Sequence, residues 1–310
     1  MAKQDEKLAK MKQKYGARGI DDGMRLNPRD FPDMLEWRDE LDPHYTKLWL
    51  DWTYGGMFKR GVLTDRVRIL VVIGQCVALD ELEMLGGHIR SALAAGATPR
   101  EVLEVILQLT VYIGLHRIGR AARVFKQVVT ELGRMDEITK TQLPVDGTSS
   151  QRTLEKDRAT WRVSEKEFPR REELVRKYGW QGVGSGLRLQ PTHHVITLEK
   201  LDRLDQNFTK LWEDFVYGGM YTRGIIDDKT REFIVVGELL VLNEGPQTEN
   251  HMRAGLMHGA TPREMLEVVL QSTVYLGMPA MTRNIGILTR ILEEQGRLHE
   301  ITDSQLPLPA

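Results

Sequence analysis

Apolar side chains recur every three to four positions along most of this chain, which is the spacing that buries one face of a helix. One predicted helix begins after Thr64, whose hydroxyl can cap it, and its apolar positions are Val67, Leu70, Val71 and Val77. A second follows the Thr-Pro-Arg-Glu capping box that starts at Thr98, and it stays apolar through Tyr112. A third covers about residues 120–132 and stops at a glycine. The chain has no alternating pattern typical of paired strands, so the sequence predicts an all-α protein.

The same pattern occurs twice. A shift of the chain against itself that places Tyr15 on Tyr178 aligns the two halves without gaps, and the segments 54–57 and 98–101 then fall on identical segments at 217–220 and 261–264. The repeat is too long for a solenoid unit, so each copy is predicted to be a helical domain. The predicted division is a first repeat at 1–145, a linker without apolar periodicity at 146–164 and a second repeat at 165–310.

The amino-acid composition excludes several classes of binding partner and site. The chain has 43 Lys and Arg against 44 Asp and Glu, which argues against a nucleic-acid partner. Its single cysteine, Cys76, excludes an intrachain disulfide and a thiolate metal cage, and the adjacent His193 and His194 have no further ligands at metal-site spacing. No apolar run is long enough to span a membrane, and the charged N-terminus lacks the apolar centre of a secretory signal, so a cytoplasmic location is expected.

Three motifs in order resemble the carboxymuconolactone decarboxylase family, within the alkylhydroperoxidase D-like superfamily. The helix start Gly-Ile-Ile-Asp-Asp-Lys-Thr-Arg-Glu-Phe-Ile at 224–234 is similar to that of the family. The stretch 251–264 resembles its histidine motif, and Val-Tyr-Leu-Gly-Met-Pro-Ala at 274–280 resembles its following turn. The resemblance covers the core of both copies and implies two tandem helical bundles of this superfamily's type.

The superfamily includes two chemistries. One branch reduces peroxides with a CxxC pair placed seven and four residues before the histidine, whereas the other decarboxylates a lactone acid without thiols. Here those positions hold Glu81 and Met84 in the first copy, and Glu244 and Gln247 in the second. A dithiol cycle needs two thiols within bonding reach, so the decarboxylase-like branch is favoured.

The residues that the resemblance points to are the candidates for proton transfer. His88 and His251 are the one histidine pair kept in both copies, and each is either a general acid/base or a histidine held in the core. Glu232 precedes His251 by the family's spacing and is expected on a neighbouring helix, where it could orient the imidazole. The first copy has Ile69 at that position. Glu81 and Glu244, seven residues before each histidine, are further catalytic candidates or solvated surface residues.

Arginines and aromatic residues are the candidates for substrate binding. Arg231 or Arg223 could hold a substrate carboxylate through two parallel hydrogen bonds, although each could equally form an ion pair. Three aromatic residues could line a pocket for a flat ring or could be core, namely Tyr217, Tyr275 and Trp212. The glycine-rich segment 182–186 is interpreted as a turn, because its counterpart in the first copy carries two acids and no phosphate-loop lysine follows.

The favoured function is a cofactor-independent decarboxylase of a small cyclic or aromatic-derived carboxylic acid, as in aromatic compound catabolism. A peroxidase or redox-stress protein and a non-catalytic ligand-binding or assembly protein are the alternatives. No pyridoxal or thiamine motif is present, and neither a cofactor nor a metal is expected. Because the second copy alone keeps Glu232, it is expected to hold the working site. The family's ring-like assemblies imply a homo-oligomer, here a homotrimer of tandem chains in which the site could be shared.

Overall fold

The computed structural model describes residues 2–145 and 153–308, with side chains from residue 6 onward. Every regular element in these ranges is helical, which confirms the predicted all-α class. The first repeat consists of α1 (Ala2–Tyr15), α2 (Ala17–Leu26), α3 (Phe31–Leu41), α4 (Pro43–Thr53), the short 3-10 helix η1 (Met57–Lys59), α5 (Asp65–Leu79), α6 (Leu82–Ala94), α7 (Pro99–Gln108), α8 (Thr110–Ile113), α9 (Leu115–Glu131) and α10 (Met135–Lys140).

The second repeat follows the same order with three differences. It consists of α11 (Leu154–Arg158), α12 (Arg171–Tyr178), α13 (Trp180–Leu189), α14 (Pro191–Leu204), α15 (Gln206–Trp212), the π-helix η2 (Glu213–Tyr217), the 3-10 helix η3 (Met220–Thr222), α16 (Asp228–Leu242), α17 (Gly245–Met257), α18 (Pro262–Gln271), α19 (Thr273–Glu294) and α20 (His299–Thr302). Here α11 precedes the shared order, the π-helix η2 matches the end of α4, and α19 spans the counterparts of both α8 and α9. In the described ranges, no helix is both long and apolar enough to cross a membrane.

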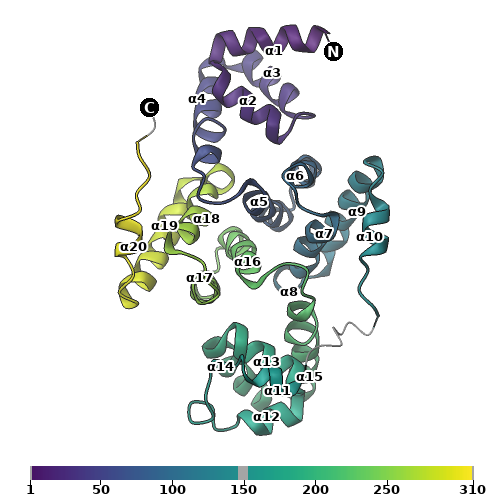
Figure 1. Cartoon of the computed structure of the whole chain (residues 1–310), viewed down its shortest axis with the longest axis vertical. Coiled ribbons are helices and arrows are strands. Elements are labelled where there is room, and N and C mark those ends of the chain that lie inside the picture. The colour runs from purple at the N-terminus through teal and green to yellow at the C-terminus, as the bar shows by residue number, and fades with distance from the viewer. Residues whose placement is uncertain (1, 146–152, 309–310) are drawn as a thin grey trace.

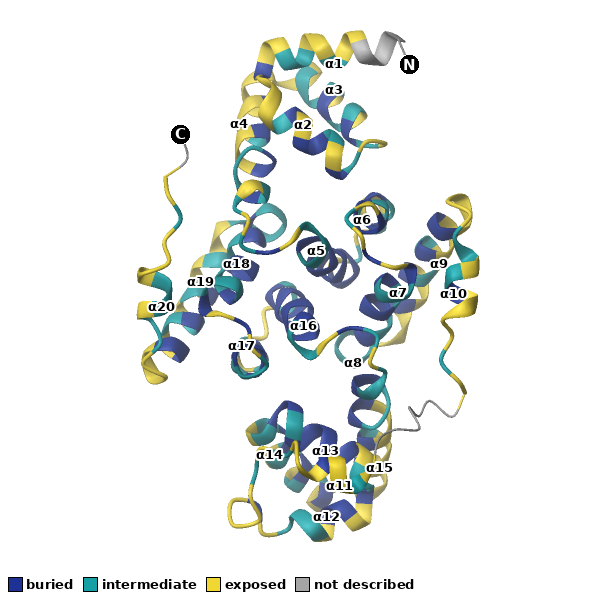
Figure 2. Ribbon diagram, viewed as in Figure 1, coloured by how far each residue is buried: buried dark blue, intermediate teal, exposed yellow. Residues whose placement is uncertain are grey.

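The two repeats meet along their central helices, α5 and α16 (Figure 1). Both helices are buried over almost their whole length (Figure 2), and each begins at a side-chain cap, Thr64 or Asp227. Equivalent glycines allow the close approach: a Cβ on Gly74 would lie 3.1 Å from Ile234, and one on Gly237 would lie 2.6 Å from the Val71 side chain. The pseudo-two-fold axis of the duplication therefore passes through this crossing.

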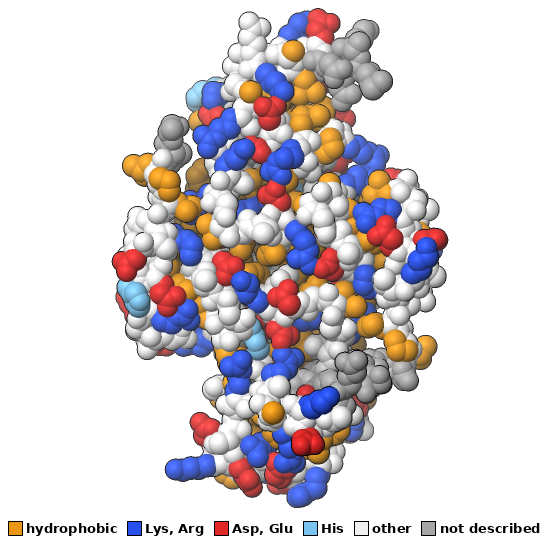
Figure 3. Space-filling model, viewed as in Figure 1, with side chains coloured by type: hydrophobic (Ala, Val, Ile, Leu, Met, Phe, Trp, Pro, Cys, Tyr) orange, Lys and Arg blue, Asp and Glu red, His pale blue; other side chains and the backbone are white. Residues whose placement is uncertain are grey.

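Helical caps stand at the two ends of the molecule. Helices α1–α4 form the cap of the first repeat, and α11–α15 form the cap of the second at the opposite end (Figure 1). Part of the predicted linker, 146–152, lies outside the described residues. Its remainder includes α11, which packs on α13, where Gly184 leaves room for the Asp157 carboxylate and the Trp161 ring. Positive and negative side chains are interspersed over the face shown in Figure 3, in keeping with the balanced composition.

Two local predictions were wrong. The segment 182–186 is not a turn but the middle of α13, where the glycines let neighbouring groups pack against the helix, as the His194 ring does at Gly186. The long apolar helix after Thr98 is also interrupted: α7 ends at Gln108, and α8 is a separate turn that stops at Gly114, whose φ is +72°. The capping box itself forms as predicted.

Candidate active site

The centre of the site is a buried pair, Glu232 on α16 and His251 on α17. The imidazole Nδ1 lies 2.6 Å from the carboxylate Oε2, and each residue is only 2% exposed. The sequence places them there because the Asp227 cap fixes the start of α16 and Pro246 fixes that of α17. Gly255, one turn after the histidine, leaves room for Glu232, since a Cβ there would lie 3.3 Å from that of the glutamate.

The hydrogen bonds assign the imidazole tautomer. Nδ1 donates to Glu232, so Nε2 carries the lone pair. The Gln190 amide nitrogen lies 2.9 Å from Nδ1 and 3.1 Å from Nε2, and since Nδ1 carries the proton shared with Glu232, the amide can donate only to Nε2; the Tyr112 hydroxyl lies 3.3 Å from Nε2 as well. The basic nitrogen of His251 therefore faces two hydrogen-bond donors.

Three tyrosines complete this polar cluster. Tyr112, on α8 of the first repeat, forms a hydroxyl–hydroxyl hydrogen bond with Tyr221 on η3 of the second. Tyr217 donates to the Gln190 side-chain oxygen at 3.5 Å. Burial raises the pKa of all three phenols above their usual range, and neighbouring groups, Glu232 among them, add to the effect. The phenols therefore stay neutral and act as hydrogen-bond donors.

The equivalent place in the first repeat lacks the acid. Ile69 stands where Glu232 stands in the second repeat, and His88 Nε2 is buried without a hydrogen-bond partner in the described structure. Burial lowers the pKa of His88 to about 4, so the imidazole is neutral at physiological pH. Tyr275, on α19 of the second repeat, lies edge-on to this ring with centroids 5.7 Å apart.

The remaining sequence candidates lie outside the cluster around His251. Glu81 and Glu244 are exposed residues at the N-terminal caps of α6 and α17, and within the described chain neither has a hydrogen bond to a histidine. Trp212 stacks on His194 behind Tyr217 rather than on His251.

The two candidate arginines bind the first repeat instead. Arg231 is buried, donates to Gln108 at 2.8 Å and lies 3.7 Å from Glu104. Arg223 donates to the other oxygen of Glu104 at 2.8 Å. Both guanidinium groups are therefore engaged at the contact between the repeats through Glu104.

Sequence reasoning missed Gln190 and Tyr221, and it considered Tyr112 only as the counterpart of Tyr275 among aromatic residues that could line a pocket or belong to the core. Gln190 ends a helix in the cap, where no motif marks it, and its counterpart in the first repeat is Asn27. The counterpart of Tyr221 in the first repeat is Phe58, which lacks the hydroxyl, and this difference was a signal in the sequence that the two copies differ here. Tyr112 is present in both copies as part of the apolar run, and only the fold shows that it reaches the other repeat.

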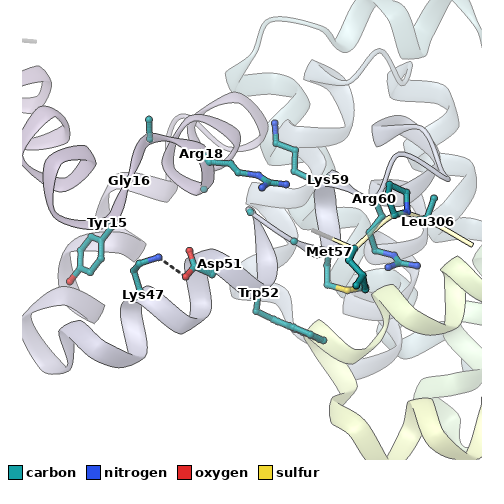
Figure 4. A pocket seen from close by; sticks show the side chains of 16 residues that line it. Tyr15, Gly16, Arg18, Lys47, Asp51, Trp52, Met57, Lys59, Arg60 and Leu306 are labelled. Atoms are coloured by element: carbon teal, nitrogen blue, oxygen red, sulfur yellow. Dashed lines mark hydrogen bonds and ion pairs between the residues drawn. The ribbon is translucent and has the colours of Figure 1, made fainter. Parts of the chain in front are cut away.

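The widest cavity among those described contains neither candidate histidine. It is an open groove of about 950 Å³ between the first repeat's cap and the C-terminal segment around Leu306 (Figure 4). Its cations are mostly paired, Lys47 with Asp51 and Arg60 with Glu267, whereas Arg18 at its edge is exposed. It has no acid–base pair of the kind found at His251.

A comparison with protein families shows to which family the chain belongs. The model of the carboxymuconolactone decarboxylase family matches the chain twice, at residues 43–127 and 206–289. The chain belongs to this family. Over 104 residues it is 26% identical to a 4-carboxymuconolactone decarboxylase of Acinetobacter baylyi, an alignment that covers 34% of this chain and 78% of that protein. Over 95 residues it is 33% identical to an uncharacterized 15.0 kDa protein of Paracoccus denitrificans, covering 30% and 71%.

The family matches include the histidines and tyrosines but leave out most of the caps. His88, His251, Tyr112 and Tyr221 all fall inside the matched ranges, whereas Gln190 lies before the second one. Most of the two caps, including Gln190, therefore lies outside the part of the chain that the family shares.

Thiol chemistry has no support in the geometry. Cys76 lies inside α5, 2% exposed, and burial, with a further contribution from Glu81, raises the pKa of its thiol to about 12. Such a thiol is neither ionised nor accessible. In the described ranges, no three His, Cys, Asp or Glu side chains are grouped to hold a metal ion.

Proposed function

We propose that this chain is a cofactor-independent carboxy-lyase acting on a small cyclic, unsaturated carboxylic acid, with His251 as its proton-transfer group. The observation that carries the proposal is the buried chain from Glu232 through His251 to Tyr112. Glu232 fixes the tautomer, so the proton-accepting nitrogen is directed at hydroxyl donors. Family membership supports the reaction class, and the relative named 4-carboxymuconolactone decarboxylase supports the substrate class.

In the proposed reaction, the protein must stabilise an oxyanion and deliver a proton to carbon. When the carbon–carbon bond to the carboxylate breaks, carbon dioxide leaves and the electron pair moves through the substrate's conjugated system onto a carbonyl oxygen. The neutral phenols of Tyr112 and Tyr221 are placed to donate hydrogen bonds to that oxyanion. His251 Nε2, which carries a lone pair in the free protein, first accepts the proton of the substrate's carboxylic acid group, and the resulting imidazolium, held by Glu232, then delivers this proton to carbon. The products are carbon dioxide and the protonated ring.

Substrate entry changes one contact. In the free protein the Gln190 amide donates to Nε2 of His251, so a substrate that takes the proton there replaces this amide. Because Arg231 and Arg223 are engaged by Glu104, we do not assign them to the substrate. As carbon dioxide forms, the negative charge of the substrate carboxylate moves onto the carbonyl oxygen and is neutralised when His251 protonates carbon, which relieves its repulsion by the buried Glu232.

The decisive test is an assay with 4-carboxymuconolactone, following carbon dioxide release and the lactone absorbance. His251→Ala should lower kcat by about a hundredfold or more, the usual range for losing a general acid or base. His44→Ala, which removes an exposed histidine on α4, is the matched control. Circular dichroism checks that both variants fold. Full turnover by His251→Ala would overturn the assignment.

We also propose that the chain forms a homo-oligomer of three copies. Two equivalent stripes of exposed apolar side chains support it, one from the end of α3 along α4 and one from the end of α14 along α15 into η2. Their members are the counterparts Leu41 and Leu204, Tyr45 and Phe208, Leu48 and Leu211, and Trp52 and Phe215. Light scattering should give three chains per particle, and Leu48→Glu with Leu211→Glu should dissociate them. A monomeric wild type would contradict the proposal.

A further inference from the structure

A cavity that is lined by His88 and not by His251 lies in the first repeat. It measures about 420 Å³, which suits a small organic ligand. Helices α3 and α4 of the cap, α5 and α6 of the repeat core and α19 of the second repeat all contribute to its wall. The aromatic part of that wall consists of Trp37, Trp49, Tyr54, Phe58 and Tyr275.

Arg38 is the feature of this wall that needs a partner. It is half-buried, and its guanidinium carbon lies 4.0 Å from the Trp37 ring centroid and 4.3 Å from that of Trp49. Its one hydrogen bond in the described structure goes to the Met34 backbone oxygen at 2.9 Å, and no carboxylate pairs with it. A desolvated guanidinium stacked on indoles, with donor edges left over, is suited to bind a carboxylate through two hydrogen bonds.

His88 supplies a second polar point in the same cavity. Its Nε2 is buried without a partner among the described residues, and Ile69 beside it cannot orient it or share a proton. The wall therefore offers a cation, a neutral imidazole and several aromatic faces, but no paired acid and base. This combination is suited to hold a planar acid rather than to react with it.

The acidic side chains at the cavity do not alter the expectation that its ligand is negatively charged. Asp33 and Glu83 are exposed, where water screens their charge. Asp30 lies 3.8 Å from Arg29, which offsets its charge. Arg38 is thus the half-buried charge on the wall that has no counter-ion among the described residues.

We propose that the cavity bounded by Arg38 and His88 is a binding site for a small aromatic or cyclic unsaturated carboxylate, separate from the site at His251. The carboxylate pairs with Arg38, the ring packs between Tyr54, Phe58 and Tyr275, and a polar edge meets His88. The second repeat cannot form this site, because Leu201 stands at the position of Arg38 and Lys200 at that of Trp37. Arg38 also precedes the range matched by the family, so the anchor belongs to the cap.

The test is direct binding of benzoate, measured by calorimetry on the full chain. The His251→Ala variant serves as background, so that neither turnover nor a failure of the proposed function affects the result. Benzoate should bind at one site per chain. Arg38→Leu, which copies the second repeat, should weaken that binding at least tenfold, and Arg38→Lys, which keeps the charge but not the fork, should weaken it less. Benzamidine, equal in shape but cationic, should not bind there.

The matched control is Arg203→Leu, which removes an exposed arginine from α14 of the second cap. It should leave benzoate binding unchanged. Thermal melting of each variant shows whether the cap still folds, and Arg38→Lys keeps the test decisive if Arg38→Leu does not. Equal benzoate affinity in all three arginine variants, or binding of benzamidine alone, would overturn the proposal.

Discussion

Tyr112 of the first repeat lies edge-on to His251 of the second, with ring centroids 5.5 Å apart and planes at 74°. Tyr275 of the second repeat lies in the same way against His88 of the first, at 5.7 Å and 73°. Each histidine therefore receives its tyrosine from the other repeat. The duplication has produced two crossed sites, of which only one has an acid beside the imidazole.

The first prediction concerns this crossed contact. Tyr112→Phe should lower kcat for the lactone acid roughly a hundredfold and change KM little, because it removes a donor that acts on the oxyanion only as charge develops. The second repeat would remain unaltered in sequence, so the loss would come from a residue in the other half of the chain. Tyr45→Phe, on an exposed ring, is the control. Equal kinetics for both variants would place the oxyanion elsewhere.

Helix starts and the acid–histidine spacing are local enough to be predicted from sequence. Thr98 with Glu101 specifies a capping box regardless of what packs on it, and Glu232 and His251 lie on successive helices whose ends are marked by Asp227 and Pro246. Such features depend on a few neighbouring residues, and the structure shows them where the pattern places them.

The crossing of the repeats could not be predicted in this way. Tyr275 follows His251 in sequence and could from sequence alone line a pocket or belong to the core, yet it contacts His88, because α8 and the start of α19 reach over the central pair into the opposite repeat. Arg231 has the appearance of a substrate anchor until Glu104 is placed beside it. Which repeat a side chain enters depends on packing between helices that lie far apart in sequence.

The buried ion pairs between repeats give the second prediction. Glu104→Leu should lower the free energy of unfolding by about 3–5 kcal/mol, since Arg231 would be left buried without a counter-charge. Denaturant titration measures this. The double variant Glu104→Leu with Arg231→Met should regain most of the loss, because the two fully buried charges are then gone and the remaining Arg223 is partly exposed to water. A double variant as unstable as the single one would mean that packing, not charge, carries the contact.

Glu238 provides the third prediction. It lies fully buried on α16 with no hydrogen bond to either oxygen from the described residues, and burial raises the pKa of its carboxyl well above the usual 4.5. The unfolded chain loses this proton above pH 4.5 while the folded one keeps it, so stability falls as pH rises beyond that value. Glu238→Gln should therefore stabilise the protein at pH 8, with a gain that disappears near pH 4.

The glutamine has a precedent in the chain itself. Gln75, the counterpart of Glu238, donates to the Ser272 hydroxyl at 2.6 Å and has no charge to bury. Urea titrations at several pH values, with the exposed Glu40→Gln as control, isolate the effect of Glu238. A gain that did not depend on pH would show that the carboxyl is not the titrating group.

His88 gives a pH dependence of the opposite sense. Its pKa is lowered from 6.5 to about 4 by burial, so between these values the unfolded state binds a proton that the folded state does not. Stability should then fall as pH drops through this window, by on the order of 3 kcal/mol in total. His88→Gln should remove this part of the acid sensitivity, whereas His299→Gln, at an exposed site, should not. An NMR titration that placed the His88 pKa near 6.5 would contradict the burial argument.

The last prediction concerns the glycine pair at the centre of the molecule. An alanine methyl at position 237 would lie 2.6 Å from Val71 Cγ1, inside contact distance in a region where the branched side chain is packed on all sides. Gly237→Ala should therefore cost roughly 1–3 kcal/mol of unfolding free energy, net of the gain in helix propensity. At Gly74 the nearest atom, on Ile234, is 3.1 Å away, so a shift of a few tenths of an ångström relieves the contact and Gly74→Ala should be close to neutral. Chemical denaturation of the two single variants side by side measures the difference. Equal costs would mean that the helices adjust equally on both sides of the axis, and that the closer packing at Gly237 is not maintained in solution.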